Sequence, residues 1–395
     1  MTDLPIPPTH VRVIAALEKR EPDRVPVMDM TMEYKLIYEA LGRKAIPLGY
    51  FFENPYTAKT LDWLWPRFDH SRIVDVAMDA FTYDKTRAAV ALGCDAAWVI
   101  HVPIFRYESS RRMHDIYGRR YDVVIDEGHS LGSPMYREGY IHSPADWEAW
   151  DKRAIFQLPA KNHRVYSKLQ KELGERIFIF GMFSGGLFEL TSQAMGFDHF
   201  AVAIRREKAF MRRYIKFYED LYCAMIEVFA DAGLPGVMYT DDLAYHSGPM
   251  LNPRAYDELF GDAYRHFTET AHSLGMKITI HSCGNVYPLL GWFADCGFDG
   301  VHALEPTAGV ELARAKEMVG DRLCLMGNID ITHILVDATR DEVYGAVRQA
   351  ILDAGAGGGY IVAPTNTHTD INLEHLRWMV EAVEKFGHYP LQTSG

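Results

Sequence analysis

Short apolar runs rich in β-branched residues alternate with longer segments of helical period along most of this chain. In the second half the apolar runs lie at residues 176–181, 236–240, 277–281, 300–304, 322–326 and 360–363. Helical patterns separate or follow them, most clearly at 253–274, 340–354 and 372–386. This alternation predicts consecutive β/α units, in which crossover helices join parallel strands.

The first half continues the same pattern with apolar runs at 25–28 and 96–100, and residues 73–77 are a further candidate strand. We predict an α/β fold closed into a TIM (β/α)8 barrel rather than an open doubly wound sheet. The reason is that no glycine-rich phosphate loop follows the first strand. Residues 105–140 differ from the β/α pattern, because their sequence predicts short strands joined by turns. They predict a small β insertion within one domain that spans residues 1–395.

Composition and charge narrow the class of protein. The 395 residues are 48% hydrophobic, which is enough for a large core and excludes wholesale disorder. The formal net charge of −12 argues against a general affinity for nucleic acid or for an anionic membrane. No run of 18 apolar residues occurs, so we expect no membrane span. The sequence leaves the oligomeric state open, and a homodimer is the commonest oligomer among soluble proteins.

The cysteines indicate a reducing compartment. Their number, five, is odd, and residues 1–20 lack the basic start and apolar run of a secretion signal. We therefore expect a cytoplasmic protein without a disulfide scaffold.

Polar side chains follow the predicted strands at their carboxyl ends. In a parallel barrel these ends meet at one rim, which is where active sites of such barrels lie. Asp242 and Asp330 are the catalytic candidates, for orienting the substrate or moving a proton. The candidates for binding a cofactor or substrate are Asn328, Asn285 and Ser184.

The sharpest chemical signal is the pair His281-x-Cys283. Residues two apart at a strand end point to the same side, and an imidazole with a thiolate suits zinc. Glu305 ends the next predicted strand, one β/α unit later, and so can approach the same ion. The fourth zinc ligand has three candidates, which are His368, a water molecule and a substrate thiol. The alternative for the pair itself is a packed core turn, because buried cysteine and histidine are common.

Asp241 and Asp242 are consecutive residues at a strand end and should point in opposite directions. One is expected to face the site and the other to cap a helix or turn. Asp330 has the same two interpretations, since it also precedes a predicted helix.

Taken together, six segments resemble the uroporphyrinogen decarboxylase superfamily over nearly the whole chain: EKREPDRVPV, DDLAYHSGPMLNPRAYDEL, KITIHSCGN, GVHALEP, MGNID and GGGYIVAPTNTH. The resemblance implies the eight-stranded barrel. True decarboxylases carry an arginine-rich segment near the first strand that grips the carboxylates of the porphyrinogen. Residues 27–34 contain no arginine here, so a polycarboxylate substrate would be poorly held.

The HSCGN segment resembles instead the cobalamin-dependent methyltransferase branch of the superfamily. That resemblance implies methyl transfer between a corrinoid, either cobalamin or a separate corrinoid protein, and a small donor or acceptor. The acceptor or donor would be a thiol, a methoxylated aromatic or a folate. In thiol-using members a His-x-Cys pair and a later cysteine bind zinc. His281 and Cys283 match the pair, whereas Thr365-Asn366-Thr367-His368 stands where the later cysteine is expected.

The sequence also fits two other functions. One is a metal-free decarboxylase acting on a smaller acid or a porphyrin relative, in which HSCGN would be a packed turn. The other is a non-catalytic barrel that binds a tetrapyrrole or a corrinoid protein. Release of carbon dioxide without a corrinoid would distinguish the first, and corrinoid binding without a change in the cobalt–methyl absorbance would distinguish the second.

Overall fold

A computed structural model describes residues 8–29, 33–44, 55–64, 67, 71–100, 105–124, 133–183, 185–367 and 370–392. Its largest sheet has eight strands that pair in parallel, each with its neighbour along the chain. In order, these strands are β1 (Met28–Asp29), β2 (Ala96–Ile100), β7 (Phe178–Met182), β8 (Gly236–Thr240), β11 (Lys277–Ser282), β12 (Gly300–Ala303), β13 (Cys324–Ile329) and β14 (Tyr360–Pro364).

The first and last strands of this sheet meet and close it. Val27 forms a parallel bridge with Val362, and the Val362 amide donates a hydrogen bond of 2.9 Å to the carbonyl of Pro26. Every residue of β2, β8 and β14 is buried, because side chains fill the barrel on one face and helices cover the other. The predicted eight-stranded barrel is therefore confirmed.

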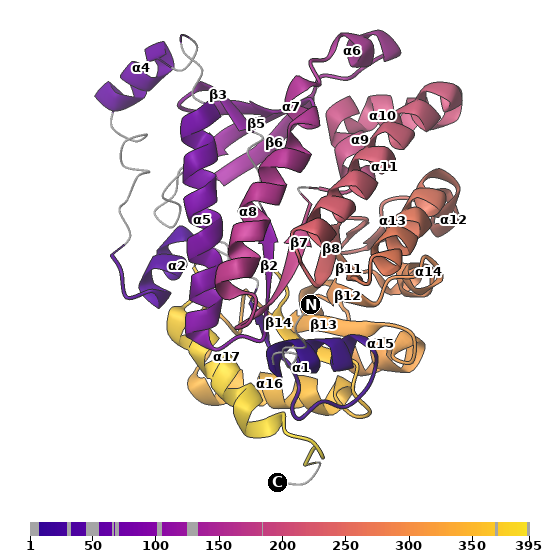
Figure 1. The fold of residues 1–395 in the computed structure, drawn as a ribbon. Helices are drawn as coiled ribbons and strands as arrows, with labels where there is room; N and C mark the ends of the chain where they lie inside the picture. Colours follow the sequence, from indigo (N-terminus) through magenta and orange to yellow (C-terminus); the bar gives the residue numbers. More distant parts are fainter. Residues whose placement is uncertain are drawn as a thin grey trace.

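Helices surround the strands on the outside of the barrel (Figure 1). The helices of the first half of the chain, including α4 and α6 that lie apart from the barrel strands (Figure 1), are α1 (Pro8–Leu17), α2 (Tyr34–Ala40), α4 (Pro55–Leu64), α5 (Ser71–Leu92), α6 (Pro144–Ala149), α7 (Arg153–Phe156), α8 (Leu158–Leu173) and α9 (Leu187–Met195). Those that follow are α10 (Phe197–Arg206), α11 (Lys208–Asp231), α12 (Pro253–Tyr256), α13 (Asp262–Ser273), α14 (Leu290–Asp295), α15 (Leu312–Val319), α16 (Arg340–Ala354) and α17 (Leu373–Phe386).

One predicted strand is wrong. Residues 73–77 belong to α5, a helix of 22 residues. The apolar β-branched residues there are only the start of a longer segment whose alanines and charged residues continue the helical period. The barrel does not need this strand, because the runs at 25–28 and 96–100 already supply β1 and β2.

Residues 105–139 contain a separate antiparallel sheet of four strands, β3 (Phe105–Ser109), β4 (Arg112–Asp115), β5 (Arg119–Val124) and β6 (Ser133–Gly139). The sheet lies at the end of the barrel opposite α1 and the C-terminus (Figure 1). It packs on α9, where the Tyr136 hydroxyl donates to the carbonyl of Gln193 at 2.9 Å. Gly139 permits this approach, since a Cβ atom there would lie 2.2 Å from the carbonyl oxygens of Gln193 and Ala194. The small sheet thus brings its side chains to the rim beside α9.

All five cysteines are free. Cys94, Cys296 and Cys324 are buried, and Cys223 lies half-buried on α11. Among the described residues, none of the helices has both the length and the apolar character needed to span a membrane.

Candidate active site

Three side chains of types that can bind a metal converge where β8 and β11 end, and they are called the metal-ligating group below. The ligand atoms of Asp242, His281 and Cys283 all lie within 4.8 Å of one another. The Sγ atom of Cys283 is 3.4 Å from Nε2 of His281, and that nitrogen is 3.9 Å from Oδ1 of Asp242. The same carboxylate oxygen accepts a hydrogen bond of 3.0 Å from the Cys283 amide, which fixes its position. The predicted His-x-Cys pair therefore shares one site with Asp242.

Glu305 lies beside this group without being one of its three members. Its Oε2 atom accepts a hydrogen bond of 3.1 Å from the amide of Gly284. Gly284 has a φ of +85°, and a Cβ atom there would lie 2.5 Å from the Ala244 carbonyl, so the turn requires glycine. Burial, and after it the carboxylates of Asp242 and Glu305, raise the pKa of the Cys283 thiol well above its ordinary value.

The end of β14 contributes an amide where the resemblance leads one to expect a cysteine. Nδ2 of Asn366 donates a hydrogen bond of 3.1 Å to Sγ of Cys283. Its Oδ1 accepts from the amide of Thr367 at 2.8 Å, which assigns the orientation of the side chain. Two predicted site residues, His368 and Ser184, lie outside the described residues.

A buried histidine pair sets the tautomer of His281. His302, its register partner on β12, lies with Nδ1 2.7 Å from Nδ1 of His281. Nε2 of His302 is 3.1 Å from the carbonyl of Pro364, which can only accept, so that nitrogen carries the proton. Nδ1 of His302 is then the acceptor and Nδ1 of His281 the donor. This leaves the lone pair of His281 Nε2 facing Cys283 and Asp242.

Burial favours the neutral form of both imidazoles, which is the form that binds metals. Burial lowers the pKa of His281, although Asp242 and Glu305 oppose that effect. Burial and the neighbouring His281 lower the pKa of His302 well below its ordinary value. Sequence reasoning missed His302. The signal available was its place in GVHAL, in a strand predicted to lie next to the strand that carries His281.

The two consecutive aspartates do point in different directions, as predicted. Asp241 is fully buried and accepts hydrogen bonds from the amides of Phe188 and Glu189 at 2.9 and 2.8 Å. Those amides lie in the first turn of α9, so Asp241 caps a helix from a neighbouring strand. Gly186 makes room for it, since a Cβ atom there would lie 2.2 Å from Cγ of Asp241.

Other polar residues at the rim hold its loops. Asn328, which has a φ of +70°, donates its side-chain amide to the carbonyl of Leu304 at 2.6 Å. Asp330 accepts from the backbone of the turn that follows it and pairs with His333 at 2.7 Å. Oδ1 of Asn285 accepts an amide hydrogen bond of 3.3 Å two residues further along. None of these three side chains is among those that line the cavity described next.

A cavity of about 450 Å³ opens on the metal-ligating group. It receives Tyr136 from the small sheet, Glu189 from α9, and residues that follow β8, β11 and β12. The described residues that line it are Tyr136, Phe188, Glu189, Ser192, Gln193, Phe197, Asp242, Ala244, Tyr245, His246, Met250, Cys283, Gly284 and Glu305.

Glu189 is the second site residue that sequence reasoning missed. Nη1 of Arg119 lies 3.3 Å from its Oε1 and 3.0 Å from Oε1 of Gln193. Arg119 also pairs with Asp115 at 2.6 Å, and both of those side chains are buried. Desolvation raises the pKa of Glu189, and Arg119 opposes that rise. The available signal was an acidic residue in the first helical turn after strand β7.

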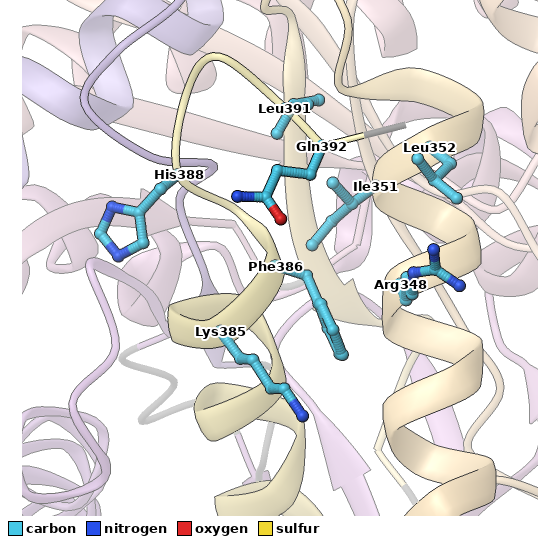
Figure 2. A pocket seen from close by; sticks show the side chains of 8 residues that line it. All are labelled: Arg348, Ile351, Leu352, Lys385, Phe386, His388, Leu391 and Gln392. Carbon is cyan, nitrogen blue, oxygen red and sulfur yellow. The ribbon is translucent and has the colours of Figure 1, made fainter. Parts of the chain in front are cut away.

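A second cavity, of about 320 Å³, lies between α16, α17 and the segment after α17 (Figure 2). Arg348 and Lys385 contribute cations to it, and Ile351 and Phe386 contribute apolar surface. It contains none of the described metal-ligating group, so we place the chemistry at the rim cavity.

The chain is similar to two kinds of enzyme. The family described as uroporphyrinogen decarboxylase (URO-D) matches residues 123–386. The methylcobamide:CoM methyltransferase MtaA of Methanosarcina barkeri is 27% identical over 164 residues, which are 41% of this chain and 44% of that enzyme. A uroporphyrinogen decarboxylase of Methylococcus capsulatus is 34% identical over 94 residues, or 24% of this chain and 25% of that enzyme. The matched part therefore spans less than half the length of these relatives.

A solved structure shares the fold over nearly the whole chain. A methyltransferase from Methanosarcina mazei superposes with a TM-score of 0.69 and covers 96% of this chain and 98% of its own. The sequence identity is 18%, so this likeness supports the fold and not the chemistry.

Proposed function

Because the chain belongs to the uroporphyrinogen decarboxylase family, we propose that it is a methyltransferase of that family, which moves a methyl group between a corrinoid and a small substrate. The observation that carries the proposal is the convergence of Asp242, His281 and Cys283 at the rim of the barrel. The similarity to a methylcobamide-using enzyme supports the corrinoid. A separate corrinoid protein is the proposed partner.

The donor set fits zinc. It combines an imidazole nitrogen, a sulfur and a carboxylate oxygen, which are the three ligand types that zinc prefers. Asp242, His281 and Cys283 would hold the ion, with Glu305 beside them. His368 or a substrate thiol would take the remaining position. The carboxylates of Asp242 and Glu305 raise the pKa of the Cys283 thiol and so disfavour its thiolate form. A cation bound there would lower that pKa and favour the thiolate.

Bound zinc would act as a Lewis acid, lowering the pKa of a substrate thiol or polarising an ether oxygen. The chain's own residues prepare the site for it. His302 keeps His281 in one tautomer, with Nε2 free to bind. Asn366 donates to the sulfur of Cys283 and favours its anionic form. Relative to the sequence-based prediction, Asp242 thus takes the role of a ligand instead of that of an orienting residue.

Metal content and cobalt spectroscopy test the proposal together. Purified protein should hold about one zinc ion per chain, and Cys283→Ala or His281→Ala should lose it. A Cys223→Ala variant, which changes a half-buried cysteine on α11, should retain it. Wild type should change the cobalt absorbance with methylcobalamin and methyl acceptors (thiols or folates), or with cob(I)alamin and methyl donors (methoxyaromatics or methylated folates). Cys283→Ala should not.

Two results would overturn the proposal. One is an unchanged cobalt spectrum with every donor and acceptor. The other is release of carbon dioxide from a carboxylated substrate in the absence of corrinoid, which would make the chain a decarboxylase like its other relatives.

A further inference from the structure

We infer that the substrate that enters the cavity beside Cys283 carries an organic cation, such as an ammonium group. This inference rests on the function proposed above, because it names the class of substrate for the same site. It is drawn from the charge and composition of the cavity wall.

The wall is negatively charged. Glu189, Asp242 and Glu305 line it, whereas the described residues of the lining include neither lysine nor arginine. A divalent metal ion bound with Cys283 as a thiolate would add a single positive charge to these three carboxylates. The cavity therefore keeps a negative charge in its metal-free and metal-bound forms, and a cation entering it is attracted in both.

The nearest guanidinium does not cancel this charge. Arg119 is 4% exposed and lies between Asp115 and Glu189. Its pairing with Asp115 at 2.6 Å already balances one carboxylate, so Glu189 remains an excess negative charge when it is ionised. When Glu189 holds a proton instead, Asp242 and Glu305 still give the wall its sign.

Aromatic residues stand beside the carboxylates. Tyr136, Phe188, Phe197 and Tyr245 belong to the same lining, and Phe197 and Tyr245 are 43% and 61% exposed. Aromatic rings next to carboxylates are the surroundings in which proteins bind organic ammonium ions. A sulfonate, carboxylate or phosphate is instead held by arginine or lysine, which the described lining does not supply.

The cavity is also of a suitable size. Its volume of about 450 Å³ lies within the range of pockets for small ligands. A compact ammonium or quaternary ammonium compound would fit next to Cys283, within reach of the metal-ligating group.

A binding experiment without corrinoid tests the inference alone. Calorimetry at pH 8, where ordinary histidines are neutral, would compare choline with its uncharged isostere 3,3-dimethylbutan-1-ol. Wild type should bind choline at least tenfold more tightly, with and without zinc. Glu305→Gln and Glu189→Gln should each reduce that ratio several-fold, with binding of the alcohol unchanged and thermal melts confirming folded protein. Glu317→Gln, on the exposed face of α15, is the matched control and should keep the ratio. Equal binding of the two compounds would overturn the inference.

Turnover then separates the inference from the proposed function. With methylcobalamin, the specificity constant should fall in the order 2-aminoethanethiol, 2-mercaptoethanol, 2-mercaptoethanesulfonate. A preference for the sulfonate would uphold methyl transfer and refute the cationic substrate. Selective choline binding with no turnover of any acceptor or donor would uphold the cationic site and refute methyl transfer.

Discussion

His302 offers no ligand atom to the rim cavity, yet its contacts determine which nitrogen of His281 is available. Replacing it with phenylalanine keeps a buried ring and removes the acceptor for the Nδ1 proton of His281. We expect His302→Phe to weaken zinc binding by about 10- to 100-fold, as removal of such supporting partners usually does. Competition with a chromophoric chelator measures the change.

The control for this variant is His302→Gln, whose side-chain oxygen can still accept from His281. It should recover most of the affinity that phenylalanine loses. Equal zinc affinity in wild type and His302→Phe would show that the histidine pair only fills space.

Asn366 occupies a position from which a second sulfur could reach the same ion. Its Nδ2 atom is 3.1 Å from Sγ of Cys283, at the end of the last strand. We expect Asn366→Cys to bind zinc at least tenfold more tightly, because thiolate is a strong zinc ligand and the amide nitrogen is not one. Asn366→Ser is the matched control and should show no gain. Measurements in excess reductant keep the two thiols from forming a disulfide, and an unchanged affinity would place the metal elsewhere.

At the residue scale, spacing along the chain predicted the pair but not its surroundings. His281-x-Cys283 was recognisable because a strand end places alternate residues on one side. His302 was not, because a histidine inside an apolar run looks like part of the core. Only the register that sets it opposite His281 reveals its role.

Helix α9 depends on a carboxylate from another element. Asp241, at the end of β8, accepts from two amides of the first turn of α9 and from the hydroxyls of Tyr239 and Tyr264. Burial raises the pKa of Asp241 to about 7, although these hydrogen bonds oppose the rise. The folded protein therefore binds a proton on Asp241 at pH values where the unfolded chain has lost it.

This pKa predicts how stability depends on pH. Between the ordinary aspartate pKa and about 7 the folded state holds more protons, so the contribution of Asp241 to stability falls as pH rises through this window. Urea unfolding from pH 4.5 to 8 should show that the free energy of unfolding of wild type falls, relative to that of Asp241→Asn, by on the order of 2–4 kcal/mol as the pH rises to about 7. Above about pH 7 the difference between the two proteins should stay constant. Parallel curves for the two proteins would contradict the raised pKa.

At the element scale, the strands were predictable and the limits of one helix were not. Runs such as 236–240 and 360–363 are apolar throughout because both of their faces are buried, and they coincide with β8 and β14 within a residue. The run at 73–77 has a similar amino-acid composition, but it lies near the start of a 22-residue helix. A short β-branched run alone does not tell a strand from the start of a helix, because the difference lies in whether the residues that follow continue the helical period.

At the scale of the whole molecule, the order of β/α units along the chain predicted a barrel. No local sequence pattern, however, predicts the pairing of the first and last strands that closes it. β1 has only two residues, and closure depends on the bridge between Val27 and Val362. These residues lie at opposite ends of the sequence, so no periodicity connects them. What aligns the first strand is a buried ion cluster.

Asp95, just before β2, is the centre of that cluster. It is 1% exposed, accepts from the Val27 amide at 2.9 Å and pairs with Arg24 at 2.7 Å and with Arg12 of α1. Asp95→Asn would remove the charge that both guanidiniums share, and breaking a buried pair typically costs about 3–5 kcal/mol. We therefore expect the variant to unfold at a clearly lower urea midpoint than wild type, because α1 and β1 lose the carboxylate that both of them contact. Asp262→Asn, at an exposed ion pair with Arg265, should leave the midpoint nearly unchanged. If the two variants unfolded at the same midpoint, the barrel would have to be closed by apolar packing alone.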